Sequence, residues 1–378
     1  MTKKLILMFV CILIMGFVSV SVSAGKTTIT FWNGFTASDG EILREIVDRF
    51  NEENPDVKVE MDIMPWAVFY QKLPPAIATG TAPSFVLMGN VDVEYYATVQ
   101  GVLQDFDDIW SATNLKESDF SPAVLDLYKH DEKYYGIPMQ YNLVYLYWNK
   151  DMFSAGGLNP EEPPHTWEEL GTCAVRLTDS SKNQFGLGMP VRTAALWWPS
   201  LIWGNGGEFF DIKEKKSLLY SPQNIESMEF LQNLAIEKQV TPLGATGPEC
   251  DNLFMSGKGL AMHIAGPYLI NGLRKNNVGF GIAASPKGKV RQQAPFISNG
   301  FAIPASTPPE EKIAVYKFLE YWNSPEICKE WTMRNGFPPY LNSLITDPDI
   351  LADPIQKSIA PLADLGKAWL KGVTEGSV

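Results

Sequence analysis

Three tryptophans lie close together in the middle of the chain and could bind a ligand with an apolar face. Trp197, Trp198 and Trp203 fall within seven positions, and the glycine-rich segment 204–207 follows them. A flat indole ring removes the C–H face of a sugar from water while the sugar hydroxyls stay available to polar partners. The spacing therefore indicates a carbohydrate platform. The alternative is that each ring is an ordinary core residue, because tryptophan is highly buried on average.

Other aromatic and amide side chains follow short apolar runs, where strands are expected to end. Amide groups both donate and accept hydrogen bonds, which suits neighbouring hydroxyls. We expect these residues to belong to the same ligand site, and they are Trp32, Asn33, Phe35, Trp66, Asn90, Gln140, Tyr141 and Asn142. For Asn142 the alternative is a structural role, in which its amide satisfies the backbone of a crossing between two lobes.

Residues for catalysis or metal binding are scarce. The three histidines, His130, His165 and His263, are far apart, and no histidine or cysteine pair has the spacing of zinc ligands. We therefore expect no metal, no cofactor and no enzymatic activity. A secreted carbohydrate-active enzyme stays the alternative from another class, because the two carboxylates of a glycosidase are paired in space rather than along the chain.

The N-terminus and the net charge limit where the protein acts. Residues 1–24 combine Lys3 and Lys4 with an apolar run and small residues up to Ala24, a pattern typical of a cleaved signal peptide. The protein is thus expected in the periplasm or outside the cell, without insertion in a membrane. A net charge of −12 makes nucleic acid and anionic membrane poor partners, since both require a basic surface.

Strands and helices alternate at the start of the expected mature chain. Residues 27–32, 57–63 and 85–88 have strand patterns, and residues 42–50 and 69–78 have helical spacing between them. This order predicts a parallel, doubly wound sheet. Ligands of such sheets bind outside the carboxyl ends of the strands, where several of the candidate residues fall.

The rest of the chain also has an α/β pattern, and its length favours a second lobe. A capping box at Thr166 and Glu169 predicts the start of a helix. The other expected elements are strands at 143–148, 260–264, 278–282 and 300–303, a helix opening at Pro267 and a long helix over 309–322.

Several segments, taken in order, resemble the family 1 extracellular solute-binding proteins of ABC importers, the group that contains maltose-binding protein. They are residues 29–32, 76–83, 136–138, 146–151, 165–169, 203–207, 257–262, 266–268, 297–300 and 318–322. The resemblance implies an α/β type II periplasmic-binding-protein fold, with two doubly wound lobes joined by a hinge of three crossings. Its expected boundaries are 25–138 plus 297–336 for the N-terminal lobe and 139–296 plus 337–378 for the C-terminal lobe.

The resemblance also implies roles for single residues. Asn142 matches a polar sugar contact after the first crossing, and Tyr268, which follows Gly266 and Pro267, matches an aromatic that stacks on sugar. Gly266 is expected in the same ligand site. Trp198 matches an aromatic residue near the cleft, and Asn299 joins the set by its place at a strand end.

Two departures from the family pattern affect these expectations. Ser84 stands where the family usually has aspartate, which is expected to change a structural hydrogen bond. The chain also ends at Val378, a few tens of residues earlier than family members usually end. A final helix and one aromatic ligand contact are therefore expected to be missing.

Together these features predict a monomeric substrate-binding subunit that captures a mono- or oligosaccharide and delivers it to the transmembrane subunits of an ABC permease. A receptor for a polyol phosphate of the glycerol-phosphate type is the alternative within the same class. That ligand would require a cation in the cleft, for which Arg192 or Arg274 is the candidate.

Overall fold

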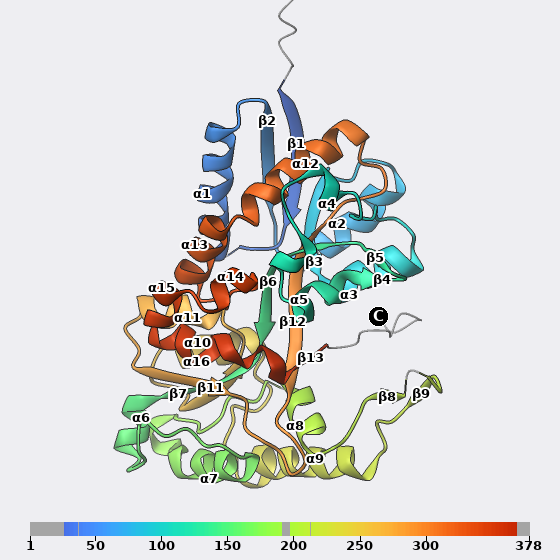
Figure 1. The fold of residues 1–378 in the computed structure, drawn as a ribbon. Helices are drawn as coiled ribbons and strands as arrows, with labels where there is room; N and C mark the ends of the chain where they lie inside the picture. Colours follow the sequence, from blue (N-terminus) through green and yellow to red (C-terminus); the bar gives the residue numbers. More distant parts are fainter. Residues whose placement is uncertain (1–25, 37, 191–196, 212, 369–378) are drawn as a thin grey trace, which may run out of the picture.

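The computed structural model describes residues 26–36, 38–190, 197–211 and 213–368. The expected signal peptide and Arg192 lie outside these ranges. One sheet occupies the upper half of the molecule and a second, smaller sheet the lower half (Figure 1). No helix in the described ranges has both the length and the apolar character needed to cross a bilayer.

The upper sheet has the strand order β13-β12-β3-β1-β2, and β6 pairs with β12 as well. β1 runs parallel to both β2 and β3, whereas β12 is antiparallel to β3. In the register Phe31 pairs with Met61 on one side and with Phe85 on the other. The strands are β1 (Thr27–Asn33), β2 (Val57–Ile63), β3 (Phe85–Gly89), β6 (Ile137–Leu143), β12 (Ala294–Ala302) and β13 (Gly366–Ala368).

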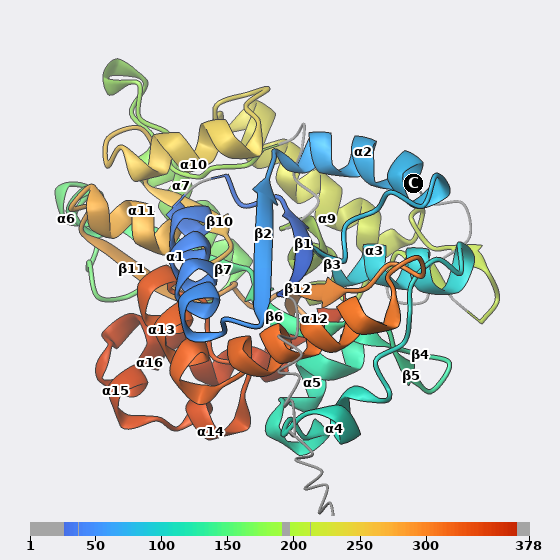
Figure 2. The same ribbon diagram turned by 90° about the horizontal axis from the view of Figure 1, so that it is seen from above.

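Helices cover both faces of the upper sheet. Figure 2 shows α2 (Trp66–Ala78) on the opposite side from α12 (Pro309–Trp322). The helix α1 (Ser38–Glu53) buries Leu43, Ile46 and Phe50, the face that its apolar spacing predicts. This arrangement confirms the doubly wound α/β sheet expected from the sequence.

The lower sheet is antiparallel in its named strands, with β7 (Tyr145–Asn149) between β10 (Met262–Ala265) and β11 (Phe280–Ala284). Single parallel bridges from Phe185 and Gly188 extend it beside β10. The helices of this half are α6 (Lys150–Ala155), α7 (Trp167–Leu177), α8 (Trp198–Gly204), α9 (Pro222–Gln232), α10 (Gly247–Met255) and α11 (Leu269–Lys275).

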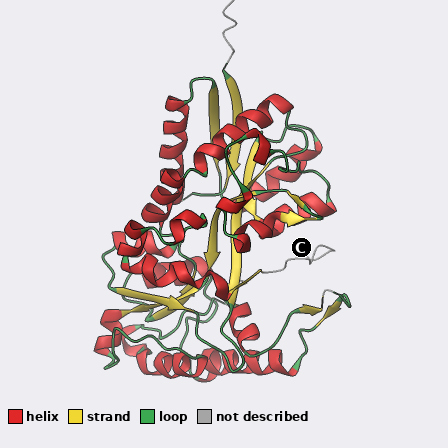
Figure 3. Cartoon of the chain, viewed as in Figure 1, coloured by secondary structure: helices red, strands yellow, loops and turns green. Residues whose placement is uncertain are grey.

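Two antiparallel strands, β6 and β12, run through the middle of the molecule and link its halves (Figures 1 and 3). Their pairing extends from Ile137 opposite Phe301 to Leu143 opposite Phe296 and is irregular between Asn299 and Gly300. The other α-helices and β-strands are α3 (Asn90–Glu94), α4 (Ile109–Ala112), α5 (Pro122–Leu125), α13 (Pro325–Asn335), α14 (Asn342–Ile345), α15 (Pro348–Ala352), α16 (Pro354–Ile359), β4 (Lys129–His130), β5 (Lys133–Tyr134), β8 (Phe210–Asp211) and β9 (Lys216–Ser217). The predicted lobe boundaries stay a prediction.

Three local expectations differ in detail from the structure. The strand expected over 300–303 begins at Ala294, and the one expected over 143–148 is divided between β6 and β7. At the start of α7, Thr166 Oγ1 accepts the Glu169 N–H at 3.1 Å, but the Glu169 carboxylate accepts from His165 N–H at 2.7 Å instead of from Thr166. The predicted start of the helix is confirmed. The Glu169 carboxylate, however, binds the backbone N–H of His165, one residue before the predicted partner Thr166.

Ser84 links β3 to β1 by hydrogen bonds, although the family usually has aspartate at this position. Its hydroxyl accepts from Thr30 N–H at 2.9 Å and donates to the Glu311 carboxylate at 2.5 Å. Thr30 Oγ1 in turn accepts Ser84 N–H at 3.0 Å. Glu311 of α12 therefore supplies the carboxylate that an aspartate at position 84 would supply.

We expect Ser84→Asp to destabilise the protein by about 1–3 kcal/mol, because it removes the hydroxyl donor and brings a second carboxylate against Glu311. The double variant Ser84→Asp/Glu311→Gln should regain most of this loss, since the amide can donate to the new carboxylate. Urea denaturation of the three proteins measures both effects. A double variant less stable than Ser84→Asp alone would contradict the pairing.

Candidate ligand-binding site

The ends of β1 and β2 carry a wall of aromatic rings. Trp66, at the start of α2, lies so close to the backbone of Gly34 that a Cβ added there would come within 2.0 Å of the indole. The indole stacks on Tyr70 at 5.8 Å between ring centroids and meets Phe35 edge to face at 5.9 Å. Trp66 is half-buried, so part of its surface is open. Tyr70 was not predicted as a site residue, although it lies one helical turn after Trp66 on α2.

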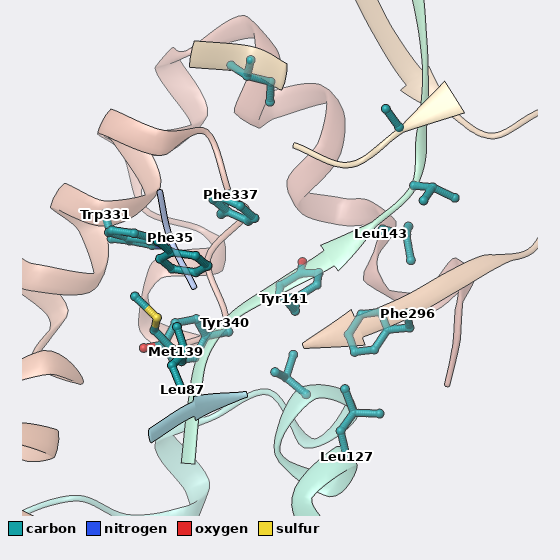
Figure 4. Packing of buried hydrophobic residues seen from close by; sticks show 14 of the residues in the cluster. Phe35, Leu87, Leu127, Met139, Tyr141, Leu143, Phe296, Trp331, Phe337 and Tyr340 are labelled. Carbon is teal, nitrogen blue, oxygen red and sulfur yellow. The ribbon is translucent and has the colours of Figure 1, made fainter. Parts of the chain in front are cut away.

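Phe35 supports this wall from inside. Its ring stacks on Trp331 at 6.0 Å, and Trp331 continues to Phe337 at 6.3 Å (Figure 4). Phe35 is only 5 % exposed. It therefore packs between β1 and α13 rather than presenting a face to a ligand.

A second group of candidate residues meets beyond β6. A Cβ on Gly266 would lie 2.7 Å from the ring of Tyr268 and 3.9 Å from Cγ of Asn142. Glycine thus allows Tyr268 to fold back over its own backbone, close to Asn142. Tyr268 is 40 % exposed, which leaves much of it accessible. Desolvation of its hydroxyl, with the nearby Asp251 carboxylate, raises the pKa of Tyr268 and keeps the group a hydrogen-bond donor.

Three polar atoms of the predicted set have no hydrogen-bond partner among the described residues, although each is buried. They are Nδ2 of Asn33, Oδ1 of Asn142 and Nε1 of Trp198. Asn33 is fully buried, and its other amide atom accepts from Phe35 N–H at 3.1 Å. Buried polar groups in folded proteins are nearly always paired. These two donors and one acceptor therefore have hydrogen-bonding capacity to spare, as do buried atoms outside the predicted set such as Tyr145 Oη and Trp322 Nε1.

Other predicted amides are used to hold the strands together. Asn90 Oδ1 accepts from Ser298 N–H at 3.0 Å, and Asn299 Oδ1 accepts from Gln140 Nε2 at 3.3 Å. Gln140 also accepts from the indole N–H of Trp331 at 3.0 Å. These contacts assign Asn90, Gln140 and Asn299 a structural role at the junction of β3, β6 and β12.

Three predicted aromatic contacts are interior residues. Tyr141 is 1 % exposed and packs on Phe296 at 5.0 Å (Figure 4). Trp197 and Trp203 are each 2 % exposed, and Lys367 Nζ lies 4.8 Å from the Trp203 ring. The predicted platform of three tryptophans is therefore corrected to Trp198, which is half-buried. The core alternative applies to the other two, because Trp197 at the N-cap of α8 and Trp203 within the helix are both buried.

Trp32 is also half-buried, in β1, where it pairs with Asp62 and Val86 in the two registers. Of the predicted set, Trp32, Asn33, Trp66, Asn142, Trp198 and Tyr268 thus keep an open surface or an unpartnered atom. A separate cavity of 480 Å³ lies between α7 and α9 and is lined by Trp167 and Phe230, but by none of the predicted residues.

Within the described part of the chain, one of the two cations predicted for a phosphate is already paired. Arg274 donates to Asp353 and is therefore engaged, and Arg192 lies outside the described residues. Within the described ranges, no group of three or more histidine, cysteine or acidic residues is arranged to hold a metal ion.

Two α/β halves joined by paired strands, with strand ends and open rings near the junction, define a binding protein of the two-lobed class. Residues 36–327 match the family described as Bacterial extracellular solute-binding protein, and the chain therefore belongs to this family.

Individual relatives are distant in sequence. The chain is 23 % identical to the maltotriose-binding protein of Pyrococcus abyssi, over 88 % of this chain and 70 % of the relative. It is 24 % identical to the sn-glycerol-3-phosphate-binding periplasmic protein UgpB of Escherichia coli K12, over 83 % and 74 %. An ABC transporter solute-binding protein of Thermotoga lettingae, solved with α-D-tagatose, superposes with a TM-score of 0.81 at 22 % identity, covering 91 % and 89 %. This likeness confirms the type II fold.

The different burial of two aromatic residues leads to a stability prediction. We expect Trp203→Ala to destabilise the protein by about 3–5 kcal/mol, because a fully packed ring is lost from the core. Tyr268→Ala should cost less, about 1–2 kcal/mol, since 40 % of that residue is exposed and a smaller packed surface is lost. Urea denaturation without ligand measures both values. Equal losses for the two variants would contradict this assignment.

Proposed function

We propose that this protein is the extracytoplasmic substrate-binding subunit of an ABC importer and that it captures a mono- or oligosaccharide between its two lobes. The observation that carries the proposal is the placement of Asn142, whose Oδ1 is unpartnered among the described residues, close to the exposed ring of Tyr268, together with the stacked rings of Trp66 and Tyr70 at the ends of β1 and β2. The rings suit the C–H face of a sugar, and the polar atoms suit its hydroxyls.

A neutral ligand is favoured over a phosphorylated one. A phosphate requires a cationic partner, and Arg274 is engaged by Asp353. The relative that binds maltotriose supports a sugar, whereas the relative that binds sn-glycerol 3-phosphate supports the alternative. Strong loss of affinity with added salt would favour the phosphate, because screening weakens charge pairing.

The mechanism is closure rather than catalysis. A ligand that contacts residues of both lobes at once favours the closed state, and the shift equals its differential affinity for closed over open. The closed form then delivers the ligand to the permease. We propose that the protein acts as a monomer in the periplasm or outside the cell.

A thermal-shift screen of the purified protein against sugars and polyol phosphates tests the proposal. A ligand that binds only the native state raises stability by RT ln(1 + [L]/Kd), which is about 2.7 kcal/mol at a concentration 100 times the Kd. We expect a neutral sugar to give the largest shift. A shift with phosphorylated polyols alone would replace the sugar by the alternative, and release of reducing sugar by the protein would replace binding by catalysis.

The aromatic contacts can be tested on the best sugar from that screen. We expect Trp66→Ala and Tyr268→Ala each to weaken its affinity by about 10- to 100-fold, or ~1.4–2.7 kcal/mol, since each removes one ring surface. Isothermal titration calorimetry measures the loss. The control is Tyr220→Ala, because Tyr220 is 94 % exposed and precedes α9, outside the candidate site. An unchanged affinity in both test variants would refute the aromatic contacts.

A further inference from the structure

Tyr147 is a buried tyrosine whose hydroxyl reaches the backbone beside the candidate site. It lies in β7, the central strand of the lower sheet, and pairs with His263 of β10. Its side chain is fully buried, and its ring packs against Phe254 and Phe280, each at 6.1 Å between ring centroids. The hydroxyl donates to the carbonyl oxygen of Gly266 at 2.8 Å. A group in the core of the lower sheet thus holds a backbone atom at the edge of the site.

Gly266 is the first residue beyond β10, which ends at Ala265. Pro267 follows, and its ring fixes φ and provides no N–H for a further strand hydrogen bond. The Pro267 carbonyl accepts from Ile270 N–H at 2.9 Å, inside α11. Tyr147 therefore anchors the chain at the point where the strand hydrogen bonds stop and the next helix has not yet begun.

The position of Gly266 determines where Tyr268 lies. A Cβ on Gly266 would come within 2.7 Å of the Tyr268 ring and 3.9 Å of Asn142 Cγ, so a small shift of this backbone would move the ring relative to Asn142. Burial raises the pKa of Tyr147 well above its ordinary value, and the neighbouring Tyr268 and Asp251 raise it further. The Tyr147 hydroxyl therefore remains a hydrogen-bond donor to Gly266.

From this geometry we infer that Tyr147 is a positioning residue, whose hydroxyl holds the Gly266 carbonyl and so keeps the ring of Tyr268 in the orientation that stacks on a sugar. The inference rests on the proposed function and adds the buried group that prepares one of its ring contacts. Tyr268 is 40 % exposed, so packing restrains only part of it. Ordering a loose side chain on binding costs free energy, and a ring that is already oriented avoids this cost.

Tyr147→Phe tests the inference, because it removes the hydroxyl and keeps the ring between Phe254 and Phe280. We expect it to weaken binding of the best sugar by about three- to tenfold, since the Gly266 carbonyl loses its donor and the segment that carries Tyr268 is less restrained. The melting temperature of the ligand-free protein should fall by about 2–4 °C. Isothermal titration calorimetry and thermal denaturation measure the two effects.

The matched control is Tyr316→Phe, which also removes one hydroxyl from a buried tyrosine. Tyr316 lies in α12 of the upper half, and its hydroxyl donates to Asp108, outside the candidate site. This variant should lower the melting temperature and leave the sugar affinity unchanged. Equal losses of affinity in Tyr147→Phe and Tyr316→Phe would show a general effect of destabilisation and overturn the inference.

The double variant Tyr147→Phe/Tyr268→Ala shows whether Tyr147 acts through Tyr268. Once the Tyr268 ring is absent, removal of the Tyr147 hydroxyl should weaken sugar binding by less than about twofold beyond Tyr268→Ala alone, because the effects of coupled residues do not add. If the two losses multiply in full, Tyr147 acts by another route and the inference is wrong.

The same titrations separate this inference from the proposed function. If the wild-type protein binds a sugar and Tyr147→Phe binds it equally well, the inference fails and the proposed function stands. If the wild-type protein binds no neutral sugar, the proposed function fails and the inference fails with it.

Discussion

The pairing of β6 with β12 is the constraint on which the rest of the structure depends. Both strands pass through the middle of the molecule, and Ser298 fastens them where they meet β3. Ser298 N–H donates to Asn90 Oδ1 at 3.0 Å, and its hydroxyl donates to Gln140 O at 2.6 Å and accepts from Tyr128 at 2.7 Å. A fully satisfied buried network of this kind fixes one arrangement, because every alternative would leave a polar group unpaired. The strand ends that carry the candidate site are positioned by it.

The aromatic residues divide into supporting and open groups around this junction. Trp331 joins the two, since its indole N–H donates to Gln140 and its ring stacks on Phe35. Phe35 in turn meets Trp66, whose surface remains partly open. A continuous chain of rings thus connects the central strands to the proposed ligand contact. Such packing keeps the open ring in one orientation before a ligand arrives, which lowers the conformational entropy lost on binding.

Charge is arranged differently at the candidate site than elsewhere on the molecule. Most acidic groups with shifted pKa values have a lysine as partner, as Asp56 has Lys317 and Asp108 has Lys312. Asp92 has the Tyr70 hydroxyl as its side-chain hydrogen-bond partner within the described residues. Unpartnered buried amide atoms make an empty site less stable than a fully paired one. Under the proposed function, the ligand hydroxyls would supply these missing partners.

The sequence by itself determined the α/β class, the alternation of β1 to β3 with α1 and α2, and the family, because periodicity and motif order are local properties of the chain. It also placed Asn33, Asn142, Trp66 and Tyr268 near strand ends. The sequence did not determine which tryptophans are exposed. Trp197, Trp198 and Trp203 share one short segment, and they differ in how far their positions at the start of α8 and within it bury each ring. Burial depends on segments far apart in the chain, and only the tertiary structure brings those segments together.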